Sequence, residues 1–303
     1  MKIEDIKNIL IIGAGTMGTQ IGLQCAMSGC DVMIYDAFPK ILEKAEKRND
    51  DLAAYLADKE LISKETAKKA LERIQYSADP EKAGQNADLV SESVPEDPEL
   101  KGRIFAQFNK ICPSRTIFTT NTSYLLPSMF AEATGRPDQF LAFHFHDVAL
   151  SKIVDVMPHP GTSQEVVDLV KSFAEKIGQI PVVLKKEKSG YIFNSMLSPL
   201  IASALNMASH DIASVEDIDR SWMGVMHTPM GPFGIMDSIG LDTVWKVSSI
   251  LPGNQNNPAA LKAADFLKEY VDKNHLGKKT GQGFYSYPEP AFLDSDFVTG
   301  KAQ

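Results

Sequence analysis

The chain lacks any apolar stretch of the length that crosses a membrane, and it lacks internal repeats and low-complexity tracts. Its first apolar run, Ile9 to Ile12, is short and has no small-residue cleavage site after it, so we expect a strand there, not a signal peptide. Positive charge is also scarce, because 31 Lys and Arg residues stand against 39 Asp and Glu residues, a formal net charge of −8. Since a nucleic-acid backbone attracts a basic surface, this balance argues against nucleic-acid binding as the main role.

Cysteine is the next scarce residue. Only Cys25, Cys30 and Cys112 occur, inside predicted elements and without the spacing of a metal site. We interpret them as reduced packing residues of a cytoplasmic protein. The 44% hydrophobic and 23% charged fractions are ordinary for a globular protein, and 303 residues suit about two domains.

The stretch from Asn8 to Asp36 carries the most informative motif. An apolar run leads into Gly13-Ala14-Gly15-Thr16-Met17-Gly18, a helical pattern follows, and a second apolar run ends at Asp36. Strand, glycine turn, helix, strand and acid form the first unit of a dinucleotide-binding fold. The first glycine permits a tight turn, the second lets the backbone approach a pyrophosphate, and the third lets the helix pack on the strand. The helix start offers free N–H groups and a positive dipole end to phosphates.

Asp36 also indicates which dinucleotide binds. A carboxylate there accepts hydrogen bonds from a ribose 2′-hydroxyl and repels a 2′-phosphate. The sequence therefore predicts NAD as the cofactor and disfavours NADP.

The rest of the chain predicts two domains. A helical hairpin from Pro39 to about Arg73 interrupts the first, and we weighed a solvated excursion against a role in gripping a large ligand. Strands then alternate with helices up to Leu184, whereas the pattern from Gly190 onward is helical. We expect an α/β, Rossmann-type, doubly wound and mostly parallel sheet in residues 1–186 and an all-helical domain in residues 187–303. The last strands are joined by short links, which allows them to run antiparallel.

A constellation for acid–base chemistry lies in the later strands. His144 and His146 alternate along one predicted strand, and Asp155 lies on the next. The segment Asn121-Thr122-Ser123 directly follows a strand, at the edge where such sheets bind ligands, and Asn194 begins the helical domain. A histidine oriented by a carboxylate, beside these polar groups and a nicotinamide, is what oxidation of a secondary alcohol requires.

With these residues in place, the chain resembles the L-3-hydroxyacyl-CoA dehydrogenase family nearly from end to end. The matching segments are GAGTMG with Asp36, VPEDPELK with Glu96 and Lys101, Asn121-Thr122-Ser123, His144-Phe145, SGYIFN ending at Asn194, Met230-Gly231-Pro232-Phe233, and Gly277 to Tyr285.

The resemblance implies roles for individual residues. His144 would be the catalytic base, with Asp155 as its carboxylate, and Ser123 and Asn194 would hold the substrate hydroxyl and thioester carbonyl. Three further residues would surround the ribose and nicotinamide of NAD: Glu96, Lys101 and Asn121. The partners would be a small acyl-CoA substrate, in fatty-acid β-oxidation, and a second copy of the chain, because the family's helical domain mediates homodimerisation.

The sequence departs from the family pattern after the histidine. Family members usually carry Asn-Pro shortly after it and a Glu twelve residues after it, whereas this chain has Phe145-His146-Asp147-Val148 and reaches Asp155 after eleven. Either the backbone moves to keep a carboxylate on His144, or the pairing is weakened. Weakened pairing should lower the rate without abolishing binding.

Three other interpretations of this cluster compete with that one. His144, His146 and His159 with Asp147 or Asp155 have metal-ligand side chains, but enzymes of this pattern need no metal and we expect none. His146 is an alternative base with Asp147 beside it. His159, between two prolines, is expected in a surface loop.

Two alternatives to a 3-hydroxyacyl-CoA dehydrogenase also stay open at this point. One is a dehydrogenase of a free β-hydroxy acid or related alcohol without CoA, since lysines that could bind CoA phosphates form no signature. The other is a non-catalytic, structural NAD-binding protein whose catalytic pair has decayed. The candidate phosphate-binding lysines are Lys59, Lys68, Lys69 and Lys188.

Overall fold

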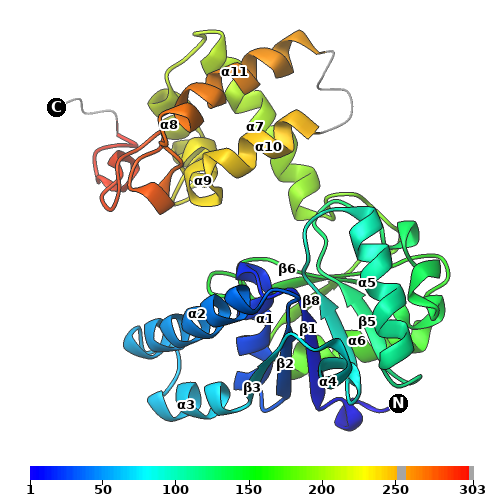
Figure 1. Cartoon of the computed structure of the whole chain (residues 1–303). Helices are drawn as coiled ribbons and strands as arrows, with labels where there is room; N and C mark the ends of the chain where they lie inside the picture. The colour runs from blue at the N-terminus through cyan, green and yellow to red at the C-terminus, as the bar shows by residue number, and fades with distance from the viewer. Residues whose placement is uncertain (251–256, 300–303) are drawn as a thin grey trace. The chain divides into compact units, whose positions relative to one another are not determined.

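The computed structural model describes residues 1–250 and 257–299 of the chain. It divides the chain into two compact units, Met1–Ile192 and Phe193–Gln303. The first is an α/β unit and the second is helical (Figure 1). Among the described residues, no helix combines the length and the apolar character needed to span a bilayer.

The first unit is built on one eight-stranded sheet with the order β3-β2-β1-β4-β5-β6-β7-β8. All neighbouring pairs are parallel except β6 and β7. The strands are β1 (Asn8–Ile12), β2 (Asp31–Tyr35), β3 (Ile74–Ser77), β4 (Leu89–Glu92), β5 (Ile117–Thr120), β6 (Phe140–Phe145), β7 (Ile153–Pro158) and β8 (Ile180–Val183). This confirms the predicted doubly wound sheet. The chain winds outward in both directions from β1 and β4, and ligands of such sheets bind beyond the carboxyl ends of the strands at that switch point.

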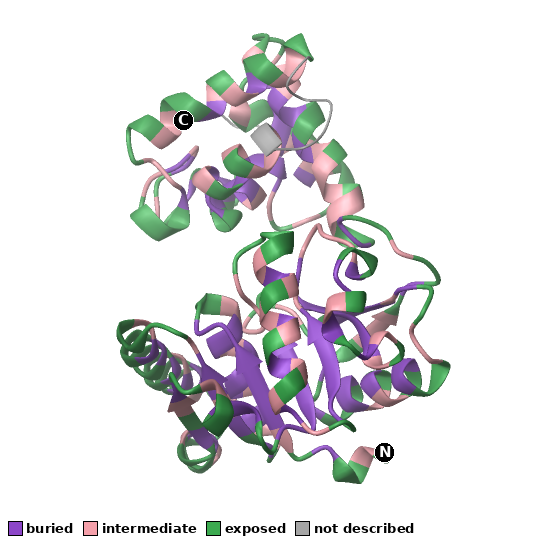
Figure 2. Cartoon of the chain, turned by 45° about the vertical axis from the view of Figure 1, so that its right-hand side comes forward, coloured by how far each residue is buried: buried purple, intermediate pink, exposed green. Residues whose placement is uncertain are grey.

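Helices cover both faces of the sheet. They are α1 (Thr16–Met27), α2 (Pro39–Asp58), α3 (Lys64–Glu72), α4 (Pro80–Gly84), α5 (Pro98–Ile111) and α6 (Gln164–Lys176). Alternate residues of β1 serve opposite faces: Ile9 and Ile11 pack in the cluster covered by α1, α2, α3 and α6, while Leu10 and Ile12 pack in the cluster covered by α4 and α5. The central strands are accordingly buried and the outer helix faces exposed, whereas the edge strand β8 is partly exposed (Figure 2).

The predicted hairpin is formed by α2 and α3. The Ser63 hydroxyl caps α3 by accepting the backbone N–H of Thr66 at 3.0 Å. Leu42, Ala45 and Ala53 of α2 join the core that contains α1. The hairpin is therefore an integral part of the first unit and not a solvated excursion.

The second unit contains α7 (Phe193–Ser209), α8 (Val215–Met226), α9 (Pro232–Ile239), α10 (Leu241–Ile250) and α11 (Pro258–Asp272). These helices confirm the helical pattern expected from Gly190 onward. Helix α9 is short, begins with Pro232 directly after Gly231, and has a strongly apolar sequence without the charged face that marks an amphipathic helix.

Two buried acids organise the second unit. Asp219 of α8 accepts the backbone N–H groups of Phe233 and Gly234 at 2.9 and 3.0 Å and the hydroxyl of Tyr285 at 3.0 Å. Asp237 of α9 accepts two backbone N–H groups, those of residues 284 and 285, at 2.9 Å each. These bonds fix the start of α9 and hold the segment after α11 against the second unit.

Two methionines of the second unit belong to its core. Met223 is buried and Met230 packs against the same core. Met226, by contrast, is 55% exposed.

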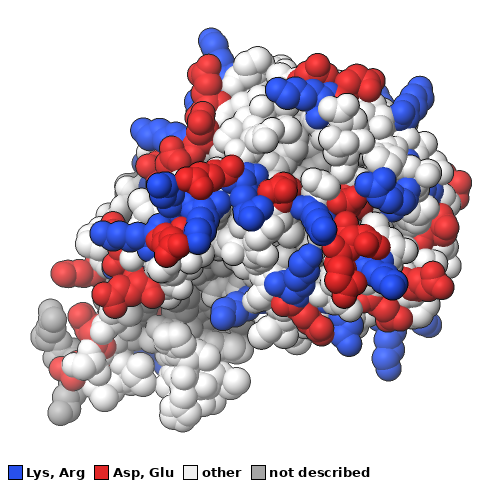
Figure 3. Space-filling view, turned by 90° about the horizontal axis from the view of Figure 1, so that it is seen from below, with Lys and Arg blue, Asp and Glu red and all other residues white. Residues whose placement is uncertain are grey.

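Basic and acidic side chains alternate over the surface. The face seen in Figure 3 shows Lys and Arg residues interspersed with Asp and Glu residues. Several of these are neighbours on one helix, such as Lys69 with Glu65 at 2.6 Å and Lys268 with Asp272 at 2.5 Å. The face in this view therefore carries charges of both signs.

Candidate active site

The glycine turn connects β1 to α1 at the switch point of the sheet. Gly13 has φ of +103°, and a Cβ there would lie 2.7 Å from the carbonyl oxygen of Ser93. A Cβ on Gly18 would lie 1.9 Å from the carbonyl oxygen of Gly13. Gly15, the N-cap of α1, is different: among the residues that the structure describes, no surrounding atom lies within 4 Å of its would-be Cβ and no side chain caps the helix. The first N–H groups of α1, at Thr16 and Met17, therefore face an open space in front of Gly15, which fits a pyrophosphate.

Asp36 lies immediately after β2 and braces this turn. Its carboxylate accepts the N–H of Ala14 at 3.0 Å and the N–H of Phe38 at 3.0 Å. A carboxylate has about four acceptor positions, so ribose hydroxyls still find free lone pairs on Asp36. Arg48 of α2 donates to the carbonyl oxygen of Ala14 at 3.1 Å, a contact between hairpin and turn that sequence reasoning missed.

A buried ion pair supports the neighbouring strand end. Lys101 of α5 is 1% exposed, and its ammonium lies 2.7 Å from Glu92 and 3.4 Å from Glu96. Glu96 accepts the hydroxyl of Thr122 at 2.8 Å and the N–H of Ser123 at 2.6 Å. Lys101 therefore holds Glu96, and Glu96 in turn positions the segment that follows β5 at the carboxyl ends of the strands.

The segment after β5 links two strand ends. The side-chain oxygen of Asn121 accepts the backbone N–H of Phe145 at 2.7 Å. This bond holds the segment Asn121-Thr122-Ser123 beside the end of β6, where His144 lies. The two motifs that the sequence separates by about twenty residues are therefore adjacent.

His144 and Asp155 face each other directly across the antiparallel pair of β6 and β7. Nδ1 of His144 lies 3.0 Å from Oδ2 of Asp155, and Nε2 of His144 lies 3.2 Å from Oγ of Ser123. The shortened loop therefore keeps the carboxylate on the histidine. With Nδ1–H donating to Asp155, the lone pair of Nε2 points toward Ser123.

The electrostatics of this pair suit a neutral imidazole. Burial lowers the pKa of His144, and the hydrogen bond to Asp155 opposes that shift without cancelling it. Burial raises the pKa of Asp155, but its hydrogen bonds to His144 and His146 outweigh burial, so the net pKa is lowered. At neutral pH the pair is an imidazole beside a carboxylate, which is the protonation state of a general base.

Tyr191 fixes the plane of the His144 ring. The two rings stack with centroids 4.4 Å apart and planes 8° apart. The Tyr191 hydroxyl donates to the carbonyl oxygen of Thr122 at 2.7 Å, and the residue holds φ of +51°, a left-handed conformation that costs about 1 kcal/mol. Tyr191 lies in the SGYIFN segment that carries the family resemblance, but the sequence assigned it no role.

The structure also places His146 and His159, the two other histidines considered for this cluster. Nε2 of His146 lies 3.2 Å from Oδ2 of Asp155, and the carboxylate of Asp147 accepts the N–H of Ala149 at 3.0 Å. The surface-loop prediction for His159 was wrong: it is 8% exposed, and its ring nitrogens bond the carbonyl oxygen of residue 137 and the N–H of residue 161. The two flanking prolines suggested an exposed loop. The imidazole can be buried because both of its ring nitrogens form hydrogen bonds to the backbone.

Asn194 occupies the first turn of α7 in the second unit. The prediction that it joins His144 in one site therefore stays a prediction.

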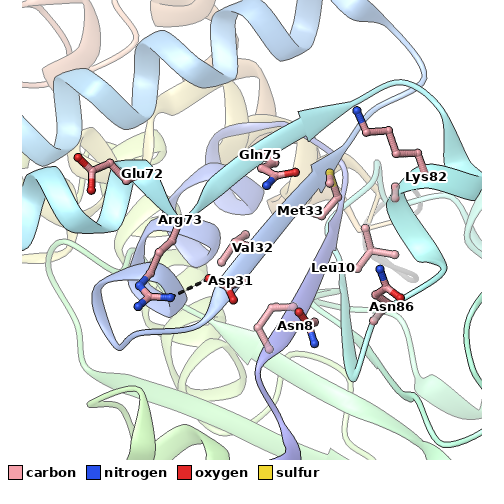
Figure 4. Close-up of a pocket in the computed structure, with 13 residues that line it drawn as sticks. Asn8, Leu10, Asp31, Val32, Met33, Glu72, Arg73, Gln75, Lys82 and Asn86 are labelled. Carbon is pink, nitrogen blue, oxygen red and sulfur yellow. Dashed lines mark hydrogen bonds and ion pairs between the residues drawn. The ribbon is translucent and has the colours of Figure 1, made fainter.

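A separate cavity of about 290 Å³ lies at the opposite edge of the sheet, near the amino ends of the strands (Figure 4). Asn8 at the start of β1, Asp31 at the start of β2 and Arg73 before β3 line it. Arg73 and Asp31 form an ion pair of 2.7 Å in its wall. Ligands of doubly wound sheets bind at the carboxyl ends, so we do not assign this cavity to the cofactor.

A glycine turn built for a pyrophosphate, beside a neutral histidine at the same sheet edge, defines an NAD-dependent dehydrogenase. Comparison with known proteins specifies the family. The model of the 3-hydroxyacyl-CoA dehydrogenase NAD-binding domain matches residues 8–188, and that of the C-terminal domain of the same family matches residues 190–287. The chain belongs to the 3-hydroxyacyl-CoA dehydrogenase family, whose reaction interconverts 3-hydroxyacyl-CoA and 3-oxoacyl-CoA with NAD.

Individual relatives agree with this assignment. A probable 3-hydroxybutyryl-CoA dehydrogenase of Bacillus subtilis (strain 168) is 34% identical over 94% of this chain and 99% of its own. The structure of (S)-3-hydroxybutyryl-CoA dehydrogenase from Ralstonia eutropha is 30% identical, covers 94% of this chain and 100% of its own, and gives a TM-score of 0.81. A solved diketoreductase, described as acting on dicarbonyl compounds, is 42% identical, covers 93% of this chain and 99% of its own, and gives a TM-score of 0.88.

These findings remove one alternative. The chain is an enzyme, so the interpretation as a non-catalytic structural protein is wrong. That interpretation assumed that His144 had lost its carboxylate partner, whereas His144 and Asp155 lie 3.0 Å apart.

Proposed function

We propose that the enzyme acts on short (S)-3-hydroxyacyl-CoA substrates, such as 3-hydroxybutyryl-CoA, with His144 as the general base. The observation that carries the proposal is the chain of contacts from Ser123 through His144 to Asp155, 3.2 Å and 3.0 Å long. It supplies an acceptor nitrogen, a polar group beside it and a carboxylate behind it, as alcohol oxidation requires.

In this mechanism Nε2 of His144 accepts the proton of the substrate hydroxyl. Asp155 keeps the other ring proton on Nδ1 and stabilises the imidazolium that forms. Ser123 hydrogen-bonds the substrate hydroxyl, and Asn194 holds the thioester carbonyl. NAD, when bound, supplies the acceptor for the hydride of the same carbon. In the reverse direction His144 returns the proton to the 3-oxo oxygen.

The cofactor contacts divide by chemistry. The open helix start receives the pyrophosphate, Asp36 receives the adenosine ribose, and the strand ends that follow receive the nicotinamide ribose and ring. Lys101 acts there through Glu96, because its own side chain is 1% exposed. The proposed NAD-binding residues are Gly13, Gly15, Thr16, Met17, Gly18, Asp36, Glu96, Lys101 and Asn121.

We also propose that the second unit binds substrate and forms a homodimer. Exposed apolar side chains support an interface there: Val225 and Met226 of α8 are 74% and 55% exposed. They line, with Trp222, an apolar groove of about 380 Å³ between α7 and α8.

The three cysteines are free and buried, which supports a reducing compartment, the cytoplasm.

The relative that is 42% identical favours a second candidate function, reduction of a dicarbonyl compound without CoA. Lys68 and Lys69, two of the lysines considered for CoA phosphates, are engaged by Glu72 and Glu65 at 3.9 and 2.6 Å. This pairing weakens the case for a phosphate site on α3. The same base and the same cofactor serve either substrate.

The test compares turnover of acetoacetyl-CoA with that of a free β-keto acid and a free diketone at equal NADH. We expect the acyl-CoA to be preferred, and turnover of the free compounds alone would assign the second function instead. Replacement His144→Gln should lower kcat by about 10²- to 10⁴-fold with the NADH dissociation constant unchanged. His210→Gln, at an exposed histidine of the second unit, is the matched control. A His144→Gln variant as active as that control would disprove the role of His144.

A further inference from the structure

One carboxylate oxygen near the end of β6 serves two imidazoles. Oδ2 of Asp155 lies 3.0 Å from Nδ1 of His144 and 3.2 Å from Nε2 of His146. The two rings meet edge to face with centroids 4.9 Å apart. One potential ligand atom from each of the three residues lies within 4.8 Å of the others.

The two distances to Asp155 are close to the ligand separations in a zinc site. Zinc binds imidazole nitrogen at about 2.0–2.1 Å and carboxylate oxygen at about 2.0–2.2 Å, so neighbouring ligands of a tetrahedral ion lie about 3.4 Å apart. Both distances to Asp155 are within a few tenths of an ångström of that value. The remaining adjustment brings His146 toward His144, and His146 lies one residue beyond the end of β6. Two imidazoles and one carboxylate are also the ligand types that zinc prefers.

We propose that His144, His146 and Asp155 form a binding site for Zn²⁺, and that the bound ion inhibits the enzyme. A water completes the coordination, because three protein ligands leave one tetrahedral position open. His146 is the entrance, since its side chain is 18% exposed while those of His144 and Asp155 are 5% and 2% exposed.

The inhibition follows from the position of the single ring proton of His144. Zn²⁺ on Nδ1 takes the lone pair of that nitrogen, and the single ring proton moves to Nε2. Nε2 then carries a proton and faces Ser123 as a donor, so it cannot accept the proton of an alcohol. No bond to substrate or cofactor is made or broken by the ion, and its removal restores the original tautomer. This consequence rests on the proposed role of His144 as base, whereas binding of the ion does not.

The first experiment measures binding. The metal-free protein competes for Zn²⁺ with a chromophoric chelator, and Co²⁺ is used as a spectroscopic probe of tetrahedral coordination. We expect a single tight site in the wild type and in His210→Gln, and binding weakened by at least about 10- to 100-fold in His146→Gln. The glutamine amide preserves a hydrogen-bond donor to Asp155, and the melting temperature of each variant shows that it folds. Equal binding by the wild type and His146→Gln, or no site in the wild type, would overturn the proposal.

The second experiment measures acetoacetyl-CoA reduction with and without Zn²⁺. We expect loss of activity in the wild type, recovery with EDTA, and resistance in His146→Gln, with NADH affinity unchanged in all cases. Binding at the site without inhibition would refute the inhibitory role alone. A metal-free wild type that reduces neither acetoacetyl-CoA nor a free β-keto acid would refute the proposed function and leave the binding result standing.

Discussion

A substitution in the turn before α1 should weaken cofactor binding without lowering the stability of the protein. Gly15 has φ of −72° and ψ of −172°, a conformation that alanine adopts readily, and the space around its would-be Cβ contains no atom within 4 Å. The replacement Gly15→Ala therefore introduces no strain into the protein. Because it restricts the unfolded chain, the free energy of unfolding should be unchanged or rise by up to about 1 kcal/mol.

The same methyl group occupies the space that a pyrophosphate needs. Displacing the phosphate removes at least one charge-assisted hydrogen bond from the start of α1, worth about 1.5–3 kcal/mol. At 1.4 kcal/mol per factor of ten, the NADH dissociation constant should rise by about 10- to 150-fold. Urea unfolding of the protein without cofactor and fluorescence titration with NADH measure the two quantities independently.

Gly18→Ala is the matched comparison. Its Cβ would lie 1.9 Å from the carbonyl oxygen of Gly13, which is backbone and cannot rotate away. We expect a loss of about 3 kcal/mol or more in the free energy of unfolding. An NADH affinity for Gly15→Ala equal to that of the wild type would refute the placement of the pyrophosphate. A Gly18→Ala variant of wild-type stability would refute the described packing of α1 on β1.

Three other predictions concern the rest of the molecule. Asp155→Asn should lower kcat by about 10- to 100-fold and, because the lost hydrogen bond raised the pKa of His144, move the acid limb of the oxidation pH profile to lower pH. Unchanged kinetics in Asp155→Asn would count against the pair, and Asp147→Asn is the control. Burial raises the pKa of Cys112 to about 12, so iodoacetamide at about pH 8 should label no thiol of the native protein and three after denaturation, as mass spectrometry would show. Asp219→Ala should lower the free energy of unfolding by about 3 kcal/mol or more, since three buried donors lose their acceptor, and a loss below about 1 kcal/mol in denaturant titration would contradict the role of that acid.

Local patterns predicted the first unit well. The turn between β1 and α1, the acid after β2 and the polar segment after β5 each depend on residues close together in sequence. Parallel strands then bring their carboxyl ends to one edge, so Asp36 and Ser123 could be assigned to the ligand edge without a structure.

Contacts between distant elements were beyond sequence reasoning. Arg48 reaches the carbonyl oxygen of Ala14 from another helix, and Tyr191 stacks on His144 from a segment beyond β8. Neither residue differs in type or spacing from an ordinary surface or core residue. Helix α9 could not be recognised from periodicity, because its apolar sequence, which begins with proline, has no amphipathic period. Its first N–H groups are bonded by the buried side chain of Asp219, which lies on another helix.

The cross-strand register of β6 and β7 explains why His144 and Asp155 stay paired across a shortened connection. His144 meets Asp155 because their strands are paired, with Phe143 opposite Val156 and Phe145 opposite Val154 on either side. The residues that join the two strands, 146–152, do not determine that meeting. This connection can therefore change in length while His144 and Asp155 stay opposite each other in the sheet.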